Sequence, residues 1–293
     1  MFATKKKIIL FFALVFFVVF NLANNIFANT FKFKTDSMPS GNYADVNGIK
    51  MYYEIQGEGK PLVLIHGGGS TIQTTFGKIL PMLSKRYKTI AVELQAHGHT
   101  TDRDAPESFV QDADDVAALL KQLNINKAFV FGFSNGGSTT LQLAIRHPEI
   151  VEKIVVVAGA YKREGFIAGF FESMPNATLD VMPQGLKAAF LKINLDTTAL
   201  MNMFNKDKQR MIDFKDWDDS DLQNIKAPAL IINADKDVVL PEHALKMSKL
   251  IPNSELIILP GLHGECLGEI ETTQHNSKLP AITVQLVEEF LDK

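Results

Sequence analysis

Short apolar runs alternate with segments of helical spacing from about residue 42 to the end of the chain. Apolar residues recur at helical spacing in residues 75–85, 108–123, 135–146, 241–250 and 280–291. The runs between them are rich in Val, Ile and Phe and have the length of strands buried on both faces: PLVLIHG, KTIAVEL, KAFVFGF, VEKIVVVAG, PALIINA and ELIILPG. The alternation predicts an α/β fold, in which helices cover both faces of a mostly parallel sheet.

Two stretches depart from this alternation. The segment ADVNGIKMYYEIQGEG carries two alternating runs around Asn47-Gly48, which predicts an antiparallel hairpin before the first parallel strand. About 65 residues separate Tyr161 from Ala227, where a crossover needs only about a dozen, and they show helical patterns rich in Phe and Met. We therefore expect a core formed by residues 42–161 and 226–293. Residues 162–225 are expected to form a helical cap over one edge of the sheet, with a few Met and Phe side chains lining a pocket.

The first thirty residues follow a different pattern. Three lysines, Lys5 to Lys7, precede thirteen unbroken apolar residues, Ile8 to Phe20, and Ala23 and Ala28 are candidate cleavage positions in the polar stretch that follows. The apolar run is shorter than the roughly 20 residues of a spanning helix and indicates a signal peptide at residues 1–28. An uncleaved N-terminal anchor is the alternative. In both cases we expect the folded part outside the cytoplasm, periplasmic or secreted, with membrane contact only through this segment.

Composition and charge narrow the class of ligand. The 293 residues are 46% hydrophobic and 22% charged, as in a folded globular chain, and the formal net charge is −3. No long basic run follows the N-terminus, so a nucleic-acid partner is not expected and a small-molecule substrate is. Cys266 is the only cysteine, which excludes an intramolecular disulfide, and we assign it no catalytic role.

A candidate nucleophile lies between a predicted strand and a predicted helix. The segment Gly132 to Gly136 has the pattern Gly-x-Ser-x-Gly, in which small residues allow a sharp turn that leaves the hydroxyl of Ser134 exposed to a substrate. The amides that begin the next helix favour negative charge nearby. Such a serine also needs a site for the oxyanion, and the glycine-rich loop in LVLIHGGGS can approach a substrate oxygen closely. We predict that the amides of Gly68 and Asn135 form this site, with Gly67 or Gly69 as alternatives to Gly68.

A serine nucleophile further needs a base and an acid that orients it. In ALIINADKDVVLPEH, Asp237 precedes three hydrophobic residues that can bury it, so we predict it as the acid and take Asp235 as its solvated neighbour. His263 directly follows the last predicted strand, between Gly261 and Gly264, and is the predicted base. The other candidate histidines fit this role less well: His66 in the glycine loop, His97 and His99 early in the chain, His147 after a helix and His243 at a helix start.

With these residues assembled, the chain resembles the α/β-hydrolase family. Gly132 to Gly136 matches the nucleophile turn of the family, His66-Gly67-Gly68 matches its oxyanion loop, and Ser134, Asp237 and His263 follow its order of Ser, acid and His. The resemblance covers about residues 42–293. It implies an eight-stranded sheet with a helical cap after the sixth strand, at residues 162–225.

One loop departs from the family pattern. The segment VELQAHGHTTD looks like the family's loop after the fourth strand, but Glu93 stands where Asp is common and Ala96 where Gly is common. The triad is untouched by this departure. A nucleophilic Ser, where other branches have Asp, argues against the epoxide-hydrolase and haloalkane-dehalogenase branches.

The residues together predict a serine hydrolase that cleaves a small-molecule carboxylic ester through an acyl-enzyme. Hydrolysis of a carbon–carbon bond in a diketone-like acid and a perhydrolase reaction with peroxide are alternatives on the same triad. A cap cation that holds a carboxylate would favour the first of these, and Lys162, Arg163, Lys187 and Lys192 are available. A further alternative is a non-catalytic exported binding protein, which would not need all three triad residues. We expect no cofactor, and no metal site, because His97-Gly98-His99 lacks a third ligand nearby.

Overall fold

The computed structural model describes residues 41–272 and 277–293. The expected export signal at residues 1–28 lies outside the described residues. Among the residues described, no helix has the length and apolar character needed to cross a membrane. By their contacts, residues Gly41–Lys293 form one compact unit.

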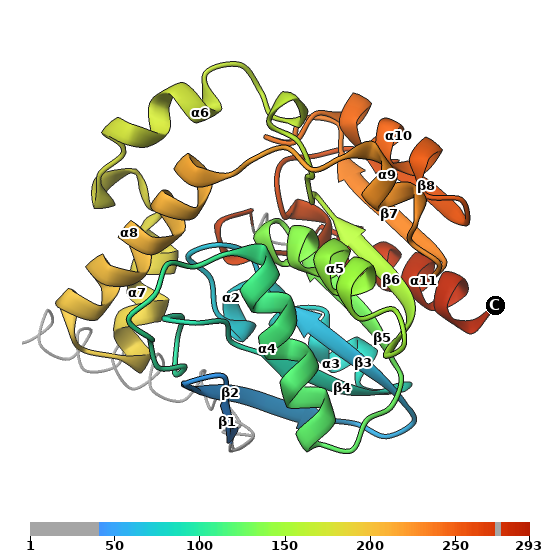
Figure 1. Cartoon of the computed structure of the whole chain (residues 1–293), viewed down its shortest axis with the longest axis horizontal. Coiled ribbons are helices and arrows are strands. Elements are labelled where there is room, and N and C mark those ends of the chain that lie inside the picture. The colour runs from blue at the N-terminus through green and yellow to red at the C-terminus, as the bar shows by residue number, and fades with distance from the viewer. Residues whose placement is uncertain (1–40, 273–276) are drawn as a thin grey trace, which may run out of the picture. The chain divides into compact units, whose positions relative to one another are not determined.

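One sheet organises this unit (Figure 1). Its eight strands lie in the order β1-β2-β4-β3-β5-β6-β7-β8; β2 pairs antiparallel with β1 and β4, and all other neighbours pair parallel. The predicted α/β fold with a mostly parallel eight-stranded sheet is thereby confirmed. The strands are β1 (Asn42–Val46), β2 (Ile49–Gln56), β3 (Lys60–Ile65), β4 (Tyr87–Val92), β5 (Ala128–Phe133), β6 (Val151–Val157), β7 (Ala229–Ala234) and β8 (Ser254–Leu259).

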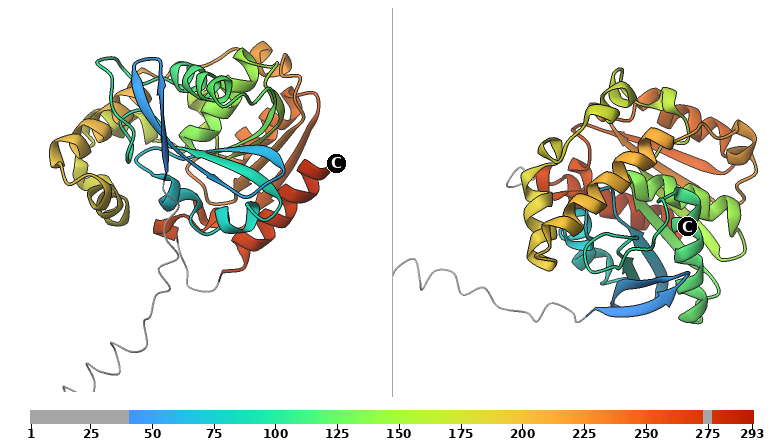
Figure 2. Two further views of the ribbon diagram at one scale, coloured as in Figure 1. Left: turned by 90° about the horizontal axis from the view of Figure 1, so that it is seen from below. Right: turned by 60° about the vertical axis from the view of Figure 1, so that its left-hand side comes forward.

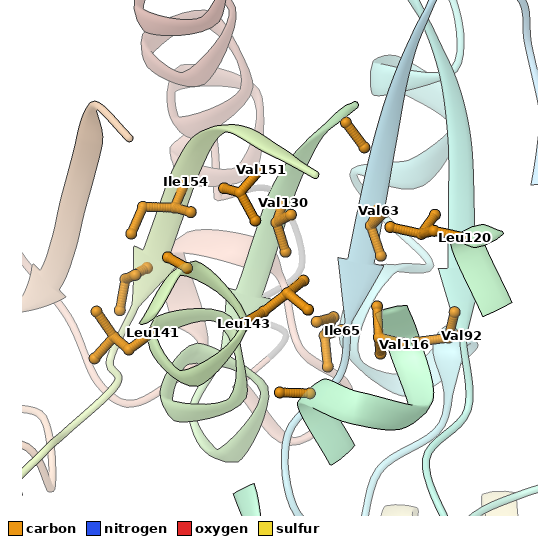
Figure 3. Packing of buried hydrophobic residues seen from close by; sticks show 14 of the residues in the cluster. Val63, Ile65, Val92, Val116, Leu120, Val130, Leu141, Leu143, Val151 and Ile154 are labelled. Carbon is orange, nitrogen blue, oxygen red and sulfur yellow. The ribbon is translucent and has the colours of Figure 1, made fainter. Parts of the chain in front are cut away.

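Helices cover both faces of the sheet. On one face, α4, α5 and α10 bury Val, Leu and Met side chains against the strands in one cluster, part of which is shown in Figure 3. On the other face, α2, α3 and α11 contribute to a second cluster with Phe129, Phe131 and Phe133 of β5. These helices are α2 (Ile72–Phe76), α3 (Leu80–Leu83), α4 (Phe109–Gln122), α5 (Asn135–Arg146), α10 (Pro241–Leu250) and α11 (Leu279–Asp292), with the 3-10 turns η4 (Glu265–Leu267) and η5 (Ile270–Thr272).

The helix predicted over residues 75–85 is wrong in its extent, because two short helices occupy this region. The first, α2, begins earlier than predicted, since the Thr71 side chain caps it by accepting a hydrogen bond from the Thr74 amide. The second, α3, has Pro81 in its first turn. Proline has no amide hydrogen to donate to the preceding turn, so a continuous helix cannot run through this point.

The cap, residues 162–225, connects β6 to β7. None of its residues belongs to a named strand, and α7 and α8 lie side by side in it (Figure 2). Its two longest helices, α7 and α8, correspond to the helical patterns expected between Tyr161 and Ala227. The elements of the cap are η1 (Arg163–Gly165), α6 (Phe170–Ser173), η2 (Met174–Asn176), η3 (Leu179–Val181), α7 (Gln184–Ile193), α8 (Thr197–Asp213) and α9 (Asp219–Gln223).

Candidate active site

Ser134 occupies a strained turn between β5 and α5. Its backbone has φ 54° and ψ −120°, a conformation that non-glycine residues rarely adopt. The turn is tight enough to require glycine on both sides. A Cβ on Gly132 would lie 2.0 Å from the Gly136 carbonyl oxygen, and one on Gly136 would lie 2.1 Å from the Ile65 carbonyl oxygen. The Gly-x-Ser-x-Gly pattern therefore reflects close approach of three backbone segments around the serine.

Replacing Gly136 by Ala is expected to destabilise the protein by about 2 kcal/mol, because the new methyl group overlaps backbone atoms that cannot rotate away. The free energy of unfolding in urea measures the effect. Gly137→Ala is the matched control, since a Cβ there approaches the nearest atom, Gly159 Cα, only to 3.0 Å. An equal loss of stability in both variants would contradict this account of the turn.

The structure brings Ser134, Asp237 and His263 together from the carboxyl ends of three strands. Ser134 Oγ lies 3.0 Å from His263 Nε2, and His263 Nδ1 lies 2.7 Å from Asp237 Oδ1. A carboxylate can only accept, so Nδ1 carries the proton and the unprotonated Nε2 accepts from the serine hydroxyl. The Asp237 side chain is 1% exposed, and its Oδ1 also accepts from the Val239 amide at 3.1 Å. The neighbouring Asp235 is exposed.

The other candidate histidines lie away from this arrangement. Burial lowers the pKa of His66 to about 3, and its neutral ring supports the glycine loop: Nε2 accepts from the Leu94 amide, and Nδ1 donates to the Gly67 carbonyl. Burial also lowers the pKa of His243 to about 4, where the ring stacks on Tyr161. His147 contacts Asp114, and His99 contacts the buried Glu93.

The loop after β4 contains Glu93 and Ala96, the two residues that differ from the family pattern. Ala96 has φ 61°, the conformation in which glycine is common. Gly98 also has positive φ, and a Cβ there would lie 2.2 Å from Glu93 Oε2. The Glu93 carboxylate accepts a hydrogen bond from the His99 amide and a longer one from the Ile72 amide. Its side chain, longer than that of the Asp common at this position, therefore connects this loop to the start of α2.

The glycine loop after β3 lies against the nucleophile. A Cβ on Gly67 would be 3.3 Å from Ser134 Cβ, and one on Gly68 would be 2.6 Å from Asn135 Nδ2. Asn135 is the first residue of α5, where amides have no partner within the helix. Gly68 and Asn135 are therefore adjacent, as an oxyanion site requires. The Gly69 amide instead donates to Asp207 of the cap at 2.6 Å.

Asp207 is the site residue that sequence reasoning missed. It lies on α8 between Met203 and Met211, four residues from each, and both of these side chains are buried. One signal was available: a carboxylate at helical spacing with buried apolar residues lies on the inward face of the helix. Its partner on the core, however, is 138 residues away in sequence and appears only in the folded chain.

Beside the glycine loop lies an apolar cavity of about 210 Å³ between the core and the cap. Gly68, Gly69 and Asn135 form its core side. The cap side consists mainly of Met and aliphatic residues, and a few cap Met and Phe side chains line the cavity as expected from the sequence. The cap residues in the wall are Met174, Ala177, Val181, Met182, Pro183, Leu186, Met203, Phe204, Asp207, Lys208 and Met211. A second cavity of about 10 Å³ adjoins Ser134 and is bounded by Phe109, Phe166 and Phe214; Asn135 and Met211 line both cavities.

The cap cations named from the sequence do not line the larger cavity. Lys162 pairs with Asp219 at 2.7 Å, Arg163 donates to the Phe214 carbonyl at 3.0 Å, and Lys187 donates to the Leu179 carbonyl at 3.3 Å. Lys192 is exposed. Lys208 does line the cavity, but its ammonium donates to the Ala177 carbonyl at 3.0 Å. Within residues 41–272 and 277–293, no group of three or more His, Cys, Asp or Glu side chains is arranged to hold a metal ion.

A nucleophile turn, a hydrogen-bonded Ser-His-Asp set and a covering cap define the class of serine-dependent α/β enzymes. A family model described as "alpha/beta hydrolase fold" matches residues 60–195. Serine hydrolase BPHL from Homo sapiens is 28% identical over 231 residues, which cover 73% of this chain and 77% of the relative. The 2-hydroxy-6-oxo-2,4-heptadienoate hydrolase of Pseudomonas putida is 26% identical over 273 residues, covering 86% and 96%.

A solved structure agrees with these relatives. The meta-cleavage product hydrolase from Pseudomonas fluorescens IP01, complexed with acetates, has a TM-score of 0.69 and 25% identity, and the match covers 86% of this chain and 97% of that one. The chain therefore has the α/β-hydrolase fold, it is similar to these hydrolases, and it is a hydrolase.

Proposed function

We propose that this hydrolase cleaves a neutral carboxylic ester, with Ser134 as nucleophile, His263 as base and Asp237 as the orienting acid. The observation that carries the proposal is the continuous chain of hydrogen bonds from Ser134 through His263 to Asp237, at 3.0 and 2.7 Å. A serine hydroxyl is a weak nucleophile until a base within hydrogen-bonding distance removes its proton. The buried carboxylate then stabilises the imidazolium that forms.

In the first half of the reaction, Ser134 Oγ bonds to the carbonyl carbon as His263 Nε2 takes its proton. The carbonyl π electrons move onto the oxygen, and the amides of Gly68 and Asn135 stabilise the resulting oxyanion by donating hydrogen bonds to it. The oxyanion then collapses, the bond to the alcohol oxygen breaks, and His263 returns its proton to that oxygen. In the second half, water attacks the acyl-enzyme by the same route, releasing the acid and restoring Ser134. Export by the predicted signal at residues 1–28 would place this reaction outside the cytoplasm.

The charge lining the larger cavity supports an ester over an anionic substrate. Asp207 contributes a carboxylate to the wall, and the ammonium of Lys208 is held by backbone carbonyls. The side chain of Arg210, one turn along α8, is 2% exposed and pairs with Glu107 at 2.6 Å. Among the residues that line this cavity, a substrate carboxylate would thus meet Asp207 and no unpaired cation, which is unfavourable in an apolar cavity. Carbon–carbon bond hydrolysis remains the second candidate, because the Pseudomonas putida relative carries that kind of substrate in its name.

Two series of aryl and alkyl esters test the proposal, one lengthened on the acyl side and one on the alcohol side. In one series kcat/KM is expected to rise about three- to fourfold with each methylene group until the chain fills the larger cavity, because each buried methylene contributes about 0.8 kcal/mol. In the other series activity should fall early, since the cavity beside Ser134 is only about 10 Å³.

The alternatives are tested beside the esters. If a 2-hydroxy-6-oxo-dienoate were turned over with a higher kcat/KM than every ester, carbon–carbon bond hydrolysis would replace the proposal. Faster formation of peracid than of acid in the presence of peroxide would favour a perhydrolase. Failure of a serine-directed phosphonate to label the protein would favour the binding-protein alternative.

A further inference from the structure

One carboxylate of the cap reaches the glycine loop of the core. Asp207 Oδ2 on α8 lies 2.6 Å from the amide nitrogen of Gly69, in the loop that follows β3. The other carboxylate oxygen, Oδ1, lies 3.3 Å from Asn135 Nδ2, directly after the nucleophile. A single cap residue therefore contacts both segments that we propose to supply the oxyanion amides.

A buried histidine fixes this carboxylate from the core side. His97 Nδ1 lies 2.8 Å from the Gln95 carbonyl oxygen, and Nε2 lies 2.9 Å from Asp207 Oδ2. Both acceptors lack protons to give, so both ring nitrogens donate and the ring is an imidazolium. Burial alone would lower the pKa of His97, but the charge of Asp207 and the hydrogen bond to it overcome burial and raise this pKa to about 9.

Arg210 fixes the carboxylate from the cap side. Its Nη1 lies 3.8 Å from Asp207 Oδ1 and 3.1 Å from Asp112 on α4, and its Nη2 lies 2.6 Å from Glu107, which precedes α4. Burial would raise the pKa of Asp207, but His97, Arg210 and the Gly69 amide hold it below its ordinary value. Asp207 is thus an anion held between two cations.

The loop that Asp207 contacts has unusual backbone freedom. Three successive glycines, Gly67 to Gly69, can adopt many conformations, and Gly69 has φ 65°. An oxyanion site works because its donors already point at the developing charge, so a loop that samples many conformations would lose much of the benefit. The Gly69 amide is the point at which the cap restrains this loop. A protonated His97 Nε2 cannot accept, so this amide donates to Asp207 although Nε2 lies 3.2 Å away.

We propose that Asp207 is a positioning residue: by holding the Gly69 amide, it sets the Gly68 amide in place for the oxyanion and makes this geometry depend on docking of the cap. The proposal rests on the proposed acyl-transfer function for its kinetic consequence. Its structural part, restraint of residues 66–71 by Asp207, does not depend on the substrate.

The test compares Asp207→Asn and Asp207→Ala with Asp213→Asn, the same chemical change at an exposed position on the same helix. In both Asp207 variants kcat for the best ester is expected to fall on the order of 10- to 100-fold with KM changed less than threefold, because an interaction that counts mainly in the transition state is lost. Amide hydrogen exchange in the peptide of residues 66–71 should accelerate at least tenfold in the same variants. Asp213→Asn should change neither quantity.

The pH dependence of kcat separates a role of Asp207 in the reaction from a purely structural one. If Asp207 only anchored the cap, replacing it would leave this pH dependence unchanged. Wild-type kcat should fall as the pH rises through about 9, where His97 loses its proton and the pair with Asp207 is weakened. In Asp207→Asn, burial acts on His97 without the opposing carboxylate, so its ring is neutral at pH 7 and the fall near pH 9 disappears. The other charged or titratable groups around this pair are His66, Glu107, Asp112, Lys208 and Arg210.

Two results would overturn the proposal. Unchanged exchange of residues 66–71 in Asp207→Asn would show that the carboxylate does not restrain the loop. Faster exchange with unchanged kcat and an unchanged pH profile would show that the restraint has no part in the reaction. If wild-type protein and Ser134→Ala were equally inactive on esters, the proposed function would fail, while the exchange measurement would still decide whether Asp207 restrains the loop.

Discussion

Ser134→Ala is expected to lower kcat for ester cleavage by about a millionfold while leaving the fold intact. The hydroxyl is the atom that bonds to the substrate, and neither His263 nor water at the same place substitutes for it. The side chain makes one hydrogen bond in the site, to His263 at 3.0 Å, and the turn itself is held by backbone contacts such as the Ser134 amide with the Val157 carbonyl at 2.8 Å. Removing one oxygen therefore removes the reaction without removing the turn.

The measurement is turnover of the best ester, with thermal unfolding of the same preparation as the check on folding. Ser220→Ala is the matched control, because Ser220 is exposed on α9. It should keep wild-type turnover and be labelled by a serine-directed phosphonate, whereas Ser134→Ala should not be labelled. Turnover of a simple aryl ester within tenfold of wild type in Ser134→Ala would rule out this serine as the nucleophile.

Asp237→Asn is expected to lower kcat by about ten-thousandfold, the second largest effect. The amide has nearly the same shape but no charge, so it stabilises the imidazolium of His263 poorly. Its NH2 group can also donate to Nδ1, which moves the ring proton to Nε2, where it blocks acceptance from Ser134. The change is measured by kcat between pH 6 and 8 and by unfolding in urea.

Asp235→Asn is the control for this variant, made by the same chemical change two residues earlier. The exposed Asp235 accepts a hydrogen bond from the Gly261 amide at 2.7 Å, which an asparagine oxygen can still accept. We expect less than a threefold change in kcat. A larger loss in Asp235→Asn than in Asp237→Asn would mean that the orienting acid has been assigned to the wrong carboxylate.

The elements whose signal is local were predictable from the sequence. Buried strands such as β5 and β7 are short, apolar and rich in β-branched or aromatic residues, and α5 and α10 begin and end where their spacing and flanking residues indicate. The exception was residues 75–85. There the periodic apolar residues continue across a break at residues 77–79, and the end of α2 and the start of α3 depend on backbone hydrogen-bond donors, which periodicity does not report.

The candidate triad could also be predicted from the sequence, because of the topology of the sheet. In a parallel sheet, loops that follow strands meet at one edge, so reactive residues placed directly after strands lie close together whatever their separation in the chain. Ser134 follows β5, Asp237 lies beyond β7 and His263 beyond β8. Order and placement therefore sufficed to name these three residues.

The sequence by itself determined the α/β fold, the sharp turn at Ser134 and the choice of Asp237 and His263 as candidates, because each depends on residues close in the chain or on strand ends that the fold brings together. Only the tertiary structure decided that Asp207 contacts the glycine loop and that the four cap cations named from the sequence do not line the cavity. Both depend on how α8 docks across the sheet edge. The helical period gives the inward face of α8 but not the core residues that it meets, and the contact between Asp207 and Gly69 spans 138 residues.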